Sequence, residues 1–152
     1  LHKHNNNNQM SNNAEKYNST TIWQWNCRGL ISNHVELIET WNSTKHKPDI
    51  ICPQETQMTT ANTTYPKIKE YDTIYYKHRT DGSQGSGLAT YVHHSIPEVS
   101  EIVINIDPDN SHMEHQGITV KIGNKIILIY NIYDPPGHNK KPNYQPLTNT
   151  QK

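Results

Sequence analysis

The sequence has no phenylalanine and few apolar residues of any kind. Phe is absent from the 152 residues, and hydrophobic side chains make up 32% of them. A globular domain usually reaches roughly 45–50% when Gly is counted among the apolar residues. The length suits one small domain. Part of the chain is therefore not expected to contribute to a core.

Neither sign of charge is in excess. Lys plus Arg number 14 and Asp plus Glu number 14, so the formal net charge is zero with His neutral. The overall basic excess of many nucleic-acid-binding proteins is missing, although a local basic patch is enough to bind a nucleic acid. The ten His residues add positive charge below about pH 6.5.

Long apolar segments and cysteine pairs are also missing. No segment approaches the roughly 20 apolar residues of a membrane span, and the longest apolar run is Ile126–Tyr130. Residues 1–13 are rich in Asn and His and lack the apolar part of a secretory signal. Cys27 and Cys52 are too few for a disulfide framework or a structural zinc site. These features predict a reduced, intracellular protein with no membrane partner.

The composition divides the chain into three parts. Residues 1–19 are Asn-rich and are expected to form a disordered tail, because they cannot bury enough apolar surface to offset backbone entropy. Residues 20–137 contain the apolar segments and form the expected domain, and residues 138–152 form an expected Pro-rich, flexible tail. The first Met is Met10, so the chain is expected either to be a fragment or to start there.

A β-α-β unit opens the expected domain. Thr20–Trp25 alternates β-branched and aromatic residues, which predicts a strand. Asn33 with Glu36 three residues later is a variant of the capping box and predicts a helix over about His34–Lys45. Asp49–Pro53 is a short apolar strand. Two strands joined through a helix are expected to be parallel.

The rest of the domain is expected to be mostly antiparallel. A polar loop over Glu55–Pro66 comes first, and Gly123-Asn124 between two β-rich segments is a strong hairpin signal. The fold class is therefore α/β, with a mixed, mostly antiparallel sheet after a β-α-β start. The expected later strands are Asp72–Lys77, Leu88–His93, Ile102–Ile106, Gly117–Ile122 and Lys125–Ile132.

Two strands, Ile50–Cys52 and Ile126–Tyr130, are apolar on both sides. A sheet in this class buries both faces or leaves one in water. The one clear helix covers one face, and no other segment is an obvious cover for the second. Nothing after residue 137 is expected to pack there. We therefore expect the chain to lack part of its fold.

Three polar residues stand where expected strands end, namely Asn26, Glu55 and Tyr133. Ligands of open α/β sheets gather at the carboxyl ends of strands. A carboxylate there can hold a hard divalent cation, an amide can orient a phosphate, and a tyrosyl hydroxyl can donate to a phosphate oxygen. Singly, each also fits a solvated loop residue, a turn residue or packing against the prolines that follow.

Four segments around these residues carry a more specific signal. They are Ile22–Leu30 (IWQWNCRGL), Pro48–Thr56 (PDIICPQET), Gly85–Val92 (GSGLATYV) and Asn131–Pro136 (NIYDPP). In order and rough spacing they resemble motifs of the endonuclease/exonuclease/phosphatase family. The resemblance runs from about Thr21 to about Gly137, and it is closest to the apurinic-type endonuclease domain of non-LTR retrotransposons.

The resemblance implies a metal-dependent phosphodiesterase in which Glu55 binds Mg²⁺ or Mn²⁺. It implies that Asn26 helps to set the metal and the phosphate, and that Tyr133 contacts the scissile phosphate or the attacking water. Arg28 and Asn131, from the same motifs, are assigned to substrate binding. The implied substrate is DNA, nicked to prime a downstream reverse transcriptase, and the implied location is the nucleus.

Two family motifs are missing from the sequence, a Gly-Asp-x-Asn turn and a terminal Ser-Asp-His. In the family they carry the Asp that activates water and a His–Asp pair that contacts phosphate. The family's Asn after Tyr-x-Pro is replaced by Pro136. The resemblance thus implies the incomplete, amino-terminal half of a four-layer α/β sandwich, inactive alone. A phosphatase of the same superfamily, and a non-catalytic remnant or binding module, are the alternatives.

Other histidine groupings point less clearly to chemistry. His112 and His115, with Glu114 between them, do not have the spacing of a helical zinc motif, and we expect solvated histidines. His93 and His94 are adjacent in an expected strand, so their side chains are expected on opposite faces.

Overall fold

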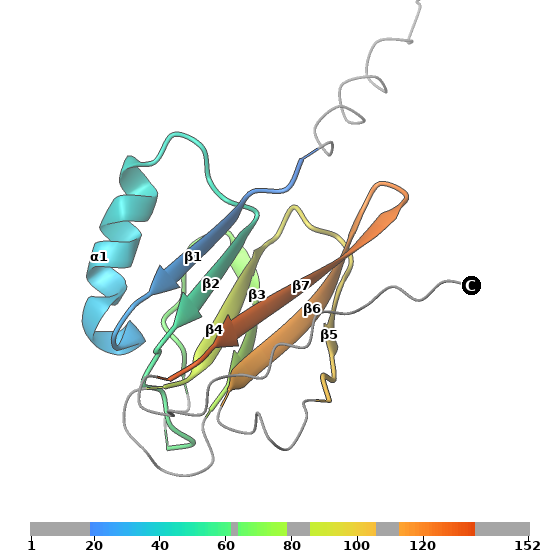
Figure 1. Ribbon diagram of the computed structural model, residues 1–152. Helices are drawn as coiled ribbons and strands as arrows, with labels where there is room; N and C mark the ends of the chain where they lie inside the picture. Colours follow the sequence, from blue (N-terminus) through green and yellow to red (C-terminus); the bar gives the residue numbers. More distant parts are fainter. Residues whose placement is uncertain (1–18, 62–63, 79–85, 106–112, 136–152) are drawn as a thin grey trace, which may run out of the picture.

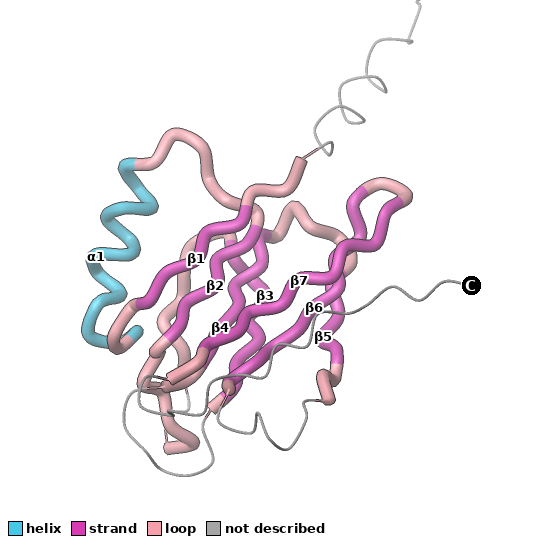
Figure 2. Tube along the Cα trace, in the orientation of Figure 1, coloured by secondary structure: helices cyan, strands magenta, loops and turns pink. Residues whose placement is uncertain are grey.

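The computed structural model describes residues 19–61, 64–78, 86–105 and 113–135 (Figure 1, Figure 2). Residues 1–18 and 138–152 of the two predicted tails lie outside these ranges. The elements, in chain order, are β1 (Ile22–Asn26), α1 (Leu30–Ser43), β2 (Ile50–Gln54), β3 (Tyr71–Lys77), β4 (Leu88–His93), β5 (Val99–Ile102), β6 (Glu114–Ile122) and β7 (Lys125–Tyr133). No helix in the described ranges is long and apolar enough to cross a membrane.

The strands form two sheets. The first has the order β1-β2-β4-β3 and the second the order β5-β6-β7. β1 and β2 are parallel, with Ile22 opposite Ile50, and the other pairs of described strands are antiparallel. Figure 1 shows α1 beside the first sheet and the second sheet on its other side. The predicted α/β class, the β-α-β start and the hairpin at Gly123-Asn124 are confirmed.

α1 differs from its predicted bounds at both ends. It begins at Leu30 rather than His34 and ends at Ser43 rather than Lys45. The predicted capping residue, Asn33, lies inside the helix, where its side-chain Nδ2 donates to a backbone carbonyl of the preceding turn at 2.7 Å. The capping-box interpretation was therefore wrong.

The backbone of another loop takes the place of a side-chain cap at the start of α1. The cap residue is Gly29, with φ 111° and no side-chain hydrogen bond. The N–H groups of Gly29 and Leu30 donate to the carbonyls of Glu55 and Thr56 at 2.8 and 2.9 Å. These bonds satisfy amide donors that lack a partner within the helix. The start of α1 thus depends on a tertiary contact that local sequence does not reveal.

Aromatic side chains fill the core between α1 and the first sheet. Trp41 is 2% exposed. Its ring meets Trp23 and Tyr71 edge to face, with centroids 6.2 and 4.7 Å apart. The other buried members of this core are Cys27, Leu30, Leu37, Ile51, Met58, Tyr65, Ile68, Ala89 and Tyr91.

A second core lies between the two sheets. β2 is buried along its whole length, with alternate residues in each core. The residues between the sheets are Ile50, Cys52, Val92, Ile96, Ile118, Val120, Ile122 and Ile129. The expectation that no element covers the second face of β2 was therefore wrong, because the second sheet covers it. Alternation shows which side chains point inward, but it does not show whether a strand extends one sheet or starts another.

The outer face of β7 remains exposed and apolar. Ile126, Leu128, Tyr130 and Ile132 are 68, 54, 49 and 46% exposed, whereas Ile129 is 8% exposed. The two-sided apolar character seen in the sequence thus corresponds to one face packed on the first sheet and one face open to solvent.

β5 lies earlier in the chain than predicted. The apolar segment Ile102–Ile106 was expected to form the strand, but β5 is Val99–Ile102 and Val103 is 92% exposed. Position 106 lies outside the described residues. Lys121 anchors the start of β5, because its N–H donates to Glu98 O at 3.0 Å and its Nζ lies 2.9 Å from Glu98 Oε1. Pairing with β6, not apolar content, sets these bounds.

We expect the free energy of unfolding to fall as pH rises above about 9. Burial raises the pKa of Cys27 and Cys52 from 9.0 to about 11, and it raises the pKa of Tyr65, Tyr71 and Tyr91. The unfolded chain therefore releases these protons at lower pH than the folded chain does, so folding loses stability through this window. Urea unfolding between pH 7 and 11 measures the effect. A free energy that stays constant from pH 8 to 11 would contradict this account.

Candidate functional site

The predicted site residues come from three strand ends. Asn26 is the last residue of β1, Glu55 follows β2 directly, and Tyr133 is the last residue of β7. β1 and β2 are parallel, so their carboxyl ends share one edge of the first sheet. β7 packs across β2 from the second sheet. The structure brings all three side chains together.

The carboxylate of Glu55 is the centre of this group. Its Oε1 accepts hydrogen bonds from Asn26 Nδ2 at 2.7 Å and from Tyr133 OH at 2.6 Å. Both bonds lie at the short end of the range for protein hydrogen bonds. Both involve Oε1, and within the described ranges no hydrogen-bond donor reaches Oε2. One oxygen of this half-buried carboxylate is thus oriented by two donors from different sheets.

The loop after β2 has unusual backbone geometry. Glu55 and Gln57 have φ values of 52° and 53°, in the left-handed region that costs a non-glycine residue roughly 1–2 kcal/mol. Hydrogen bonds hold the loop in place, because Thr56 N–H donates to Gly87 O at 3.0 Å and Gln57 N–H donates to Ser86 O at 2.8 Å. The contacts with α1 described above hold its other side. Strain retained in this way is common at functional sites.

Gly87, in the third of the four motifs, allows the loop to approach β4 closely. Its φ is 106°, and a Cβ atom at this position would lie 2.5 Å from Thr56 Oγ1. Only a residue without a side chain fits there. The glycine of this motif therefore has a structural reason, which is to support the loop that carries Glu55.

Gln54 links the two sheets immediately before Glu55. It is 6% exposed, and its Nε2 donates to Ile132 O at 2.6 Å and to Asn131 Oδ1 at 3.2 Å. Its Oε1 accepts from Gln24 Nε2 at 2.8 Å. No role was predicted for Gln54 from the sequence, although a polar residue at the end of an otherwise apolar strand indicates a specific polar contact. Gln54 fixes β7 against β2 next to the point where Tyr133 meets the carboxylate.

Asn131 lies inside the sandwich, away from the surface. It is 4% exposed, and its Nδ2 donates to Ala89 O at 3.0 Å and to Pro53 O at 3.3 Å. With the bond from Gln54, both ends of its amide are used by the protein itself. This placement favours a structural link between the sheets over the predicted contact with substrate.

Arg28 lies beside Asn26 at an open polar pocket of about 370 Å³. Its backbone is also left-handed, with φ 46°, and its side chain is exposed. An exposed guanidinium beside the carboxylate group is placed to meet an anion, so its predicted substrate role remains a prediction. The pocket is lined by Trp25, Asn26, Cys27, Arg28, Asn33 and Glu36.

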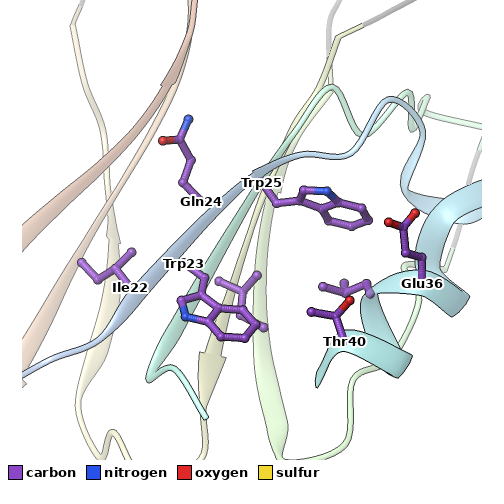
Figure 3. Close-up of a pocket in the computed structure, with 8 residues that line it drawn as sticks. Ile22, Trp23, Gln24, Trp25, Glu36 and Thr40 are labelled. Atoms are coloured by element: carbon purple, nitrogen blue, oxygen red, sulfur yellow. The ribbon is translucent and has the colours of Figure 1, made fainter. Parts of the chain in front are cut away.

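A second, more apolar pocket of about 300 Å³ lies between β1 and α1. Figure 3 shows Trp23 and Trp25 on the side of β1 that faces α1, and Gln24 on the other side. Trp25 and Glu36 line both pockets. The polar edge near Asn26 therefore continues into an apolar groove along β1.

The histidine groupings form no metal site in the part of the chain that the structure describes. No group of three or more His, Cys, Asp or Glu side chains there could hold a metal ion. Position 112 lies outside the described residues, His115 is half-buried, and Glu114 between them is 8% exposed. The rings of His93 and His94 lie 4.4 Å apart. The prediction of opposite faces was wrong because β4 ends at His93 and the alternation ends with it.

The architecture is α/β, with the β-α-β start, the mixed sheet and the antiparallel second sheet, and it matches in part the fold of a solved catalytic domain. A solved structure that resembles it is the crystal structure of the Xenopus laevis APE2 catalytic domain, with a TM-score of 0.52 and 22% sequence identity. The match covers 80% of this chain and 47% of that one, so the chain spans about half the length of that domain. No family model matches the sequence, and no curated protein is detectably similar to it.

Replacing Gln54 by Leu is expected to lower the free energy of unfolding by about 2–4 kcal/mol, because it leaves buried acceptors on Asn131 and Ile132 without a donor. Urea denaturation measures the change. Gln24→Ala is the matched control, since it removes only the exposed end of the same network and should cost less than about 1 kcal/mol. Equal losses in the two variants would show that the link between the sheets does not depend on Gln54.

Proposed function

We propose that the chain is part of a metal-dependent phosphodiesterase of the DNA endonuclease type, in which Glu55 binds Mg²⁺ or Mn²⁺. One observation carries the proposal, namely that Asn26 and Tyr133 both donate to Glu55 Oε1 at the end of the first sheet. The two donors hold one oxygen of this carboxylate in a fixed position. The fold supports the same reading, since it resembles that of the APE2 catalytic domain.

The residues present fit a magnesium site of the open kind. Mg²⁺ takes oxygen ligands and is usually held by one or two carboxylates, with waters and substrate phosphates completing the set. Glu55 supplies one such carboxylate, and the side-chain amide of Asn26 lies next to it. The part of the chain that the structure describes offers no larger cluster of ligands, which suits a cation that water and phosphate help to hold.

The chain's own residues would bind and orient the substrate. A bound divalent ion would supply positive charge to the oxygens of a phosphate group. Asn26 and Tyr133 fix the direction of the Glu55 carboxylate. The Tyr133 hydroxyl has a single proton, so its donation to a phosphate oxygen would replace its bond to Glu55. Arg28 supplies a guanidinium, which pairs well with phosphate.

The group that removes a proton from the attacking water is not among these residues. The sequence has no Gly-Asp-x-Asn and no Ser-Asp-His. We therefore propose that the chain provides the metal-binding part of the site, and that an Asp and a His from elsewhere complete it. The finer proposal is a retrotransposon-type enzyme that nicks DNA in the nucleus, with a reverse transcriptase as partner.

Two other functions remain as alternatives. A phosphatase acting on a soluble or lipid phosphoester would use the same strand-end carboxylate, but the segments IWQWNCRGL and NIYDPP favour the nuclease. A non-catalytic binding module is favoured by the missing motifs alone. Extending the reading frame beyond Lys152 separates the three. A downstream Gly-Asp-x-Asn, Ser-Asp-His and reverse transcriptase supports the nuclease, and an immediate stop codon supports the binding module.

Metal binding tests the proposed site directly. We expect the chain to bind Mn²⁺ with a dissociation constant on the order of 10⁻⁴–10⁻³ M, as for weak oxygen-ligand sites. Glu55→Gln should weaken binding by about tenfold or more, because it removes the charged ligand. Electron paramagnetic resonance of free Mn²⁺ measures both values. Glu36→Gln is the matched control, an exposed carboxylate of the adjacent pocket whose loss should leave the affinity unchanged. Absence of binding, or an equal effect of both variants, would overturn the proposal.

Catalysis gives a separate prediction. With Mg²⁺ and supercoiled plasmid DNA, the 152-residue chain should nick no faster than its Glu55→Ala variant, because no residue of the site accepts the proton of the attacking water. Gel separation of supercoiled and nicked plasmid measures the rate. Mg²⁺-dependent nicking that Glu55→Ala abolishes would show that the chain already carries a complete catalytic set.

A further inference from the structure

Glu114 is a buried carboxylate that the proposed function does not use. It begins β6 and is 8% exposed. Its Oε2 accepts the N–H of Gly87 at 2.7 Å, whereas its Oε1 has no hydrogen-bond partner among the residues that the structure describes. Burying a carboxylate with one oxygen unsatisfied is costly. The hydrogen bond that this carboxylate accepts from Gly87 offsets part of that cost.

One side of Glu114 supports the loop that carries Glu55. Gly87, whose N–H it accepts, in turn accepts the N–H of Thr56 through its own carbonyl at 3.0 Å. Thr56 also lies so close to Gly87 that a Cβ atom at position 87 would be 2.5 Å from Thr56 Oγ1. The carboxylate of Glu114 is thus linked to Thr56, the residue that follows Glu55, through one side-chain to backbone hydrogen bond and one backbone hydrogen bond.

The other side of Glu114 adjoins Tyr133. The two residues are direct partners in the β6–β7 ladder. Side chains directly opposite each other in antiparallel strands lie on the same face, with Cβ atoms about 4.5–5.5 Å apart. Glu114 therefore lies between the residue that donates to the Glu55 carboxylate and the loop that holds this carboxylate.

We propose that Glu114 is a positioning residue of the metal site, which sets the distance between the Glu55 carboxylate and the Tyr133 hydroxyl by holding Gly87 on one side and adjoining Tyr133 on the other. The inference rests on the proposed function for its metal readout. Glu114 binds no metal in this account, and it acts through Gly87 and the backbone of Thr56.

Three variants separate positioning from general stability. Glu114→Ala removes the acceptor of the Gly87 N–H and should weaken Mn²⁺ binding by about tenfold, as loss of a supporting residue behind a metal ligand typically does. Glu114→Gln keeps an acceptor oxygen and should retain affinity within about threefold of the original chain. Val120→Ala, on the same strand and 1% exposed in the core between the sheets, should lower stability but leave Mn²⁺ affinity unchanged.

Amide hydrogen exchange gives a second readout that needs no metal. In Glu114→Ala the N–H groups of Gly87 and Thr56 should exchange about tenfold faster relative to those of the β6–β7 ladder, because the bond that holds Gly87 is lost. In Val120→Ala any loss of protection should spread over both sheets. Two-dimensional NMR resolves the individual amides.

The outcomes distinguish this inference from the proposed function. If the original chain binds no Mn²⁺, the proposed metal site fails, and amide exchange still tests the link from Glu114 to the loop. If the chain binds Mn²⁺ but Glu114→Ala keeps both affinity and local protection, the inference is overturned. It is also overturned if Val120→Ala weakens Mn²⁺ binding as strongly as Glu114→Ala does.

Discussion

The shared hydrogen bonding of the Glu55 carboxylate is the constraint on which the rest of the site depends. One oxygen accepts from an amide on β1 and from a hydroxyl on β7. These bonds require two strands of one sheet and one strand of another to end at the same place. They also require a loop with left-handed residues at Glu55 and Gln57. The strain of that loop is tolerated because hydrogen bonds from α1 and from the residues before β4 hold it on both sides.

Buried polar residues between the two sheets help to keep the Glu55 carboxylate in contact with its two donors. Apolar packing between the sheets allows small shifts of one sheet against the other, whereas hydrogen bonds between named atoms do not. Gln54 and Asn131 form such bonds between β2, β4 and β7, next to the site. Glu114 adds a third polar contact, from β6 to Gly87. The aromatic core under α1 and the aliphatic core between the sheets supply the burial, and the polar links set the register.

Local sequence patterns predicted the elements whose signals are local. The parallel β-α-β unit, the hairpin at Gly123-Asn124 and the meeting of Asn26, Glu55 and Tyr133 follow from strand ends, turn residues and motif order. Local patterns do not reveal where α1 starts, where β5 begins and ends, or what covers β2, because each is set by a contact with a distant segment. The burial of Asn131 and Glu114 likewise depends on distant contacts and is not visible in the local sequence. Both are polar residues that a pattern assigns to solvent or substrate, and the packing of two sheets buries them.

The most direct test of the proposed metal site is the position of a bound cation in a crystal of the chain soaked with Mn²⁺. Anomalous diffraction locates the ion independently of any activity. We expect a peak beside Oε2 of Glu55, within about 2.0–2.3 Å of it, with Asn26 and Tyr133 still bonded to Oε1. A well-ordered Glu55 with no peak, or an ion bound only at another carboxylate, would contradict it.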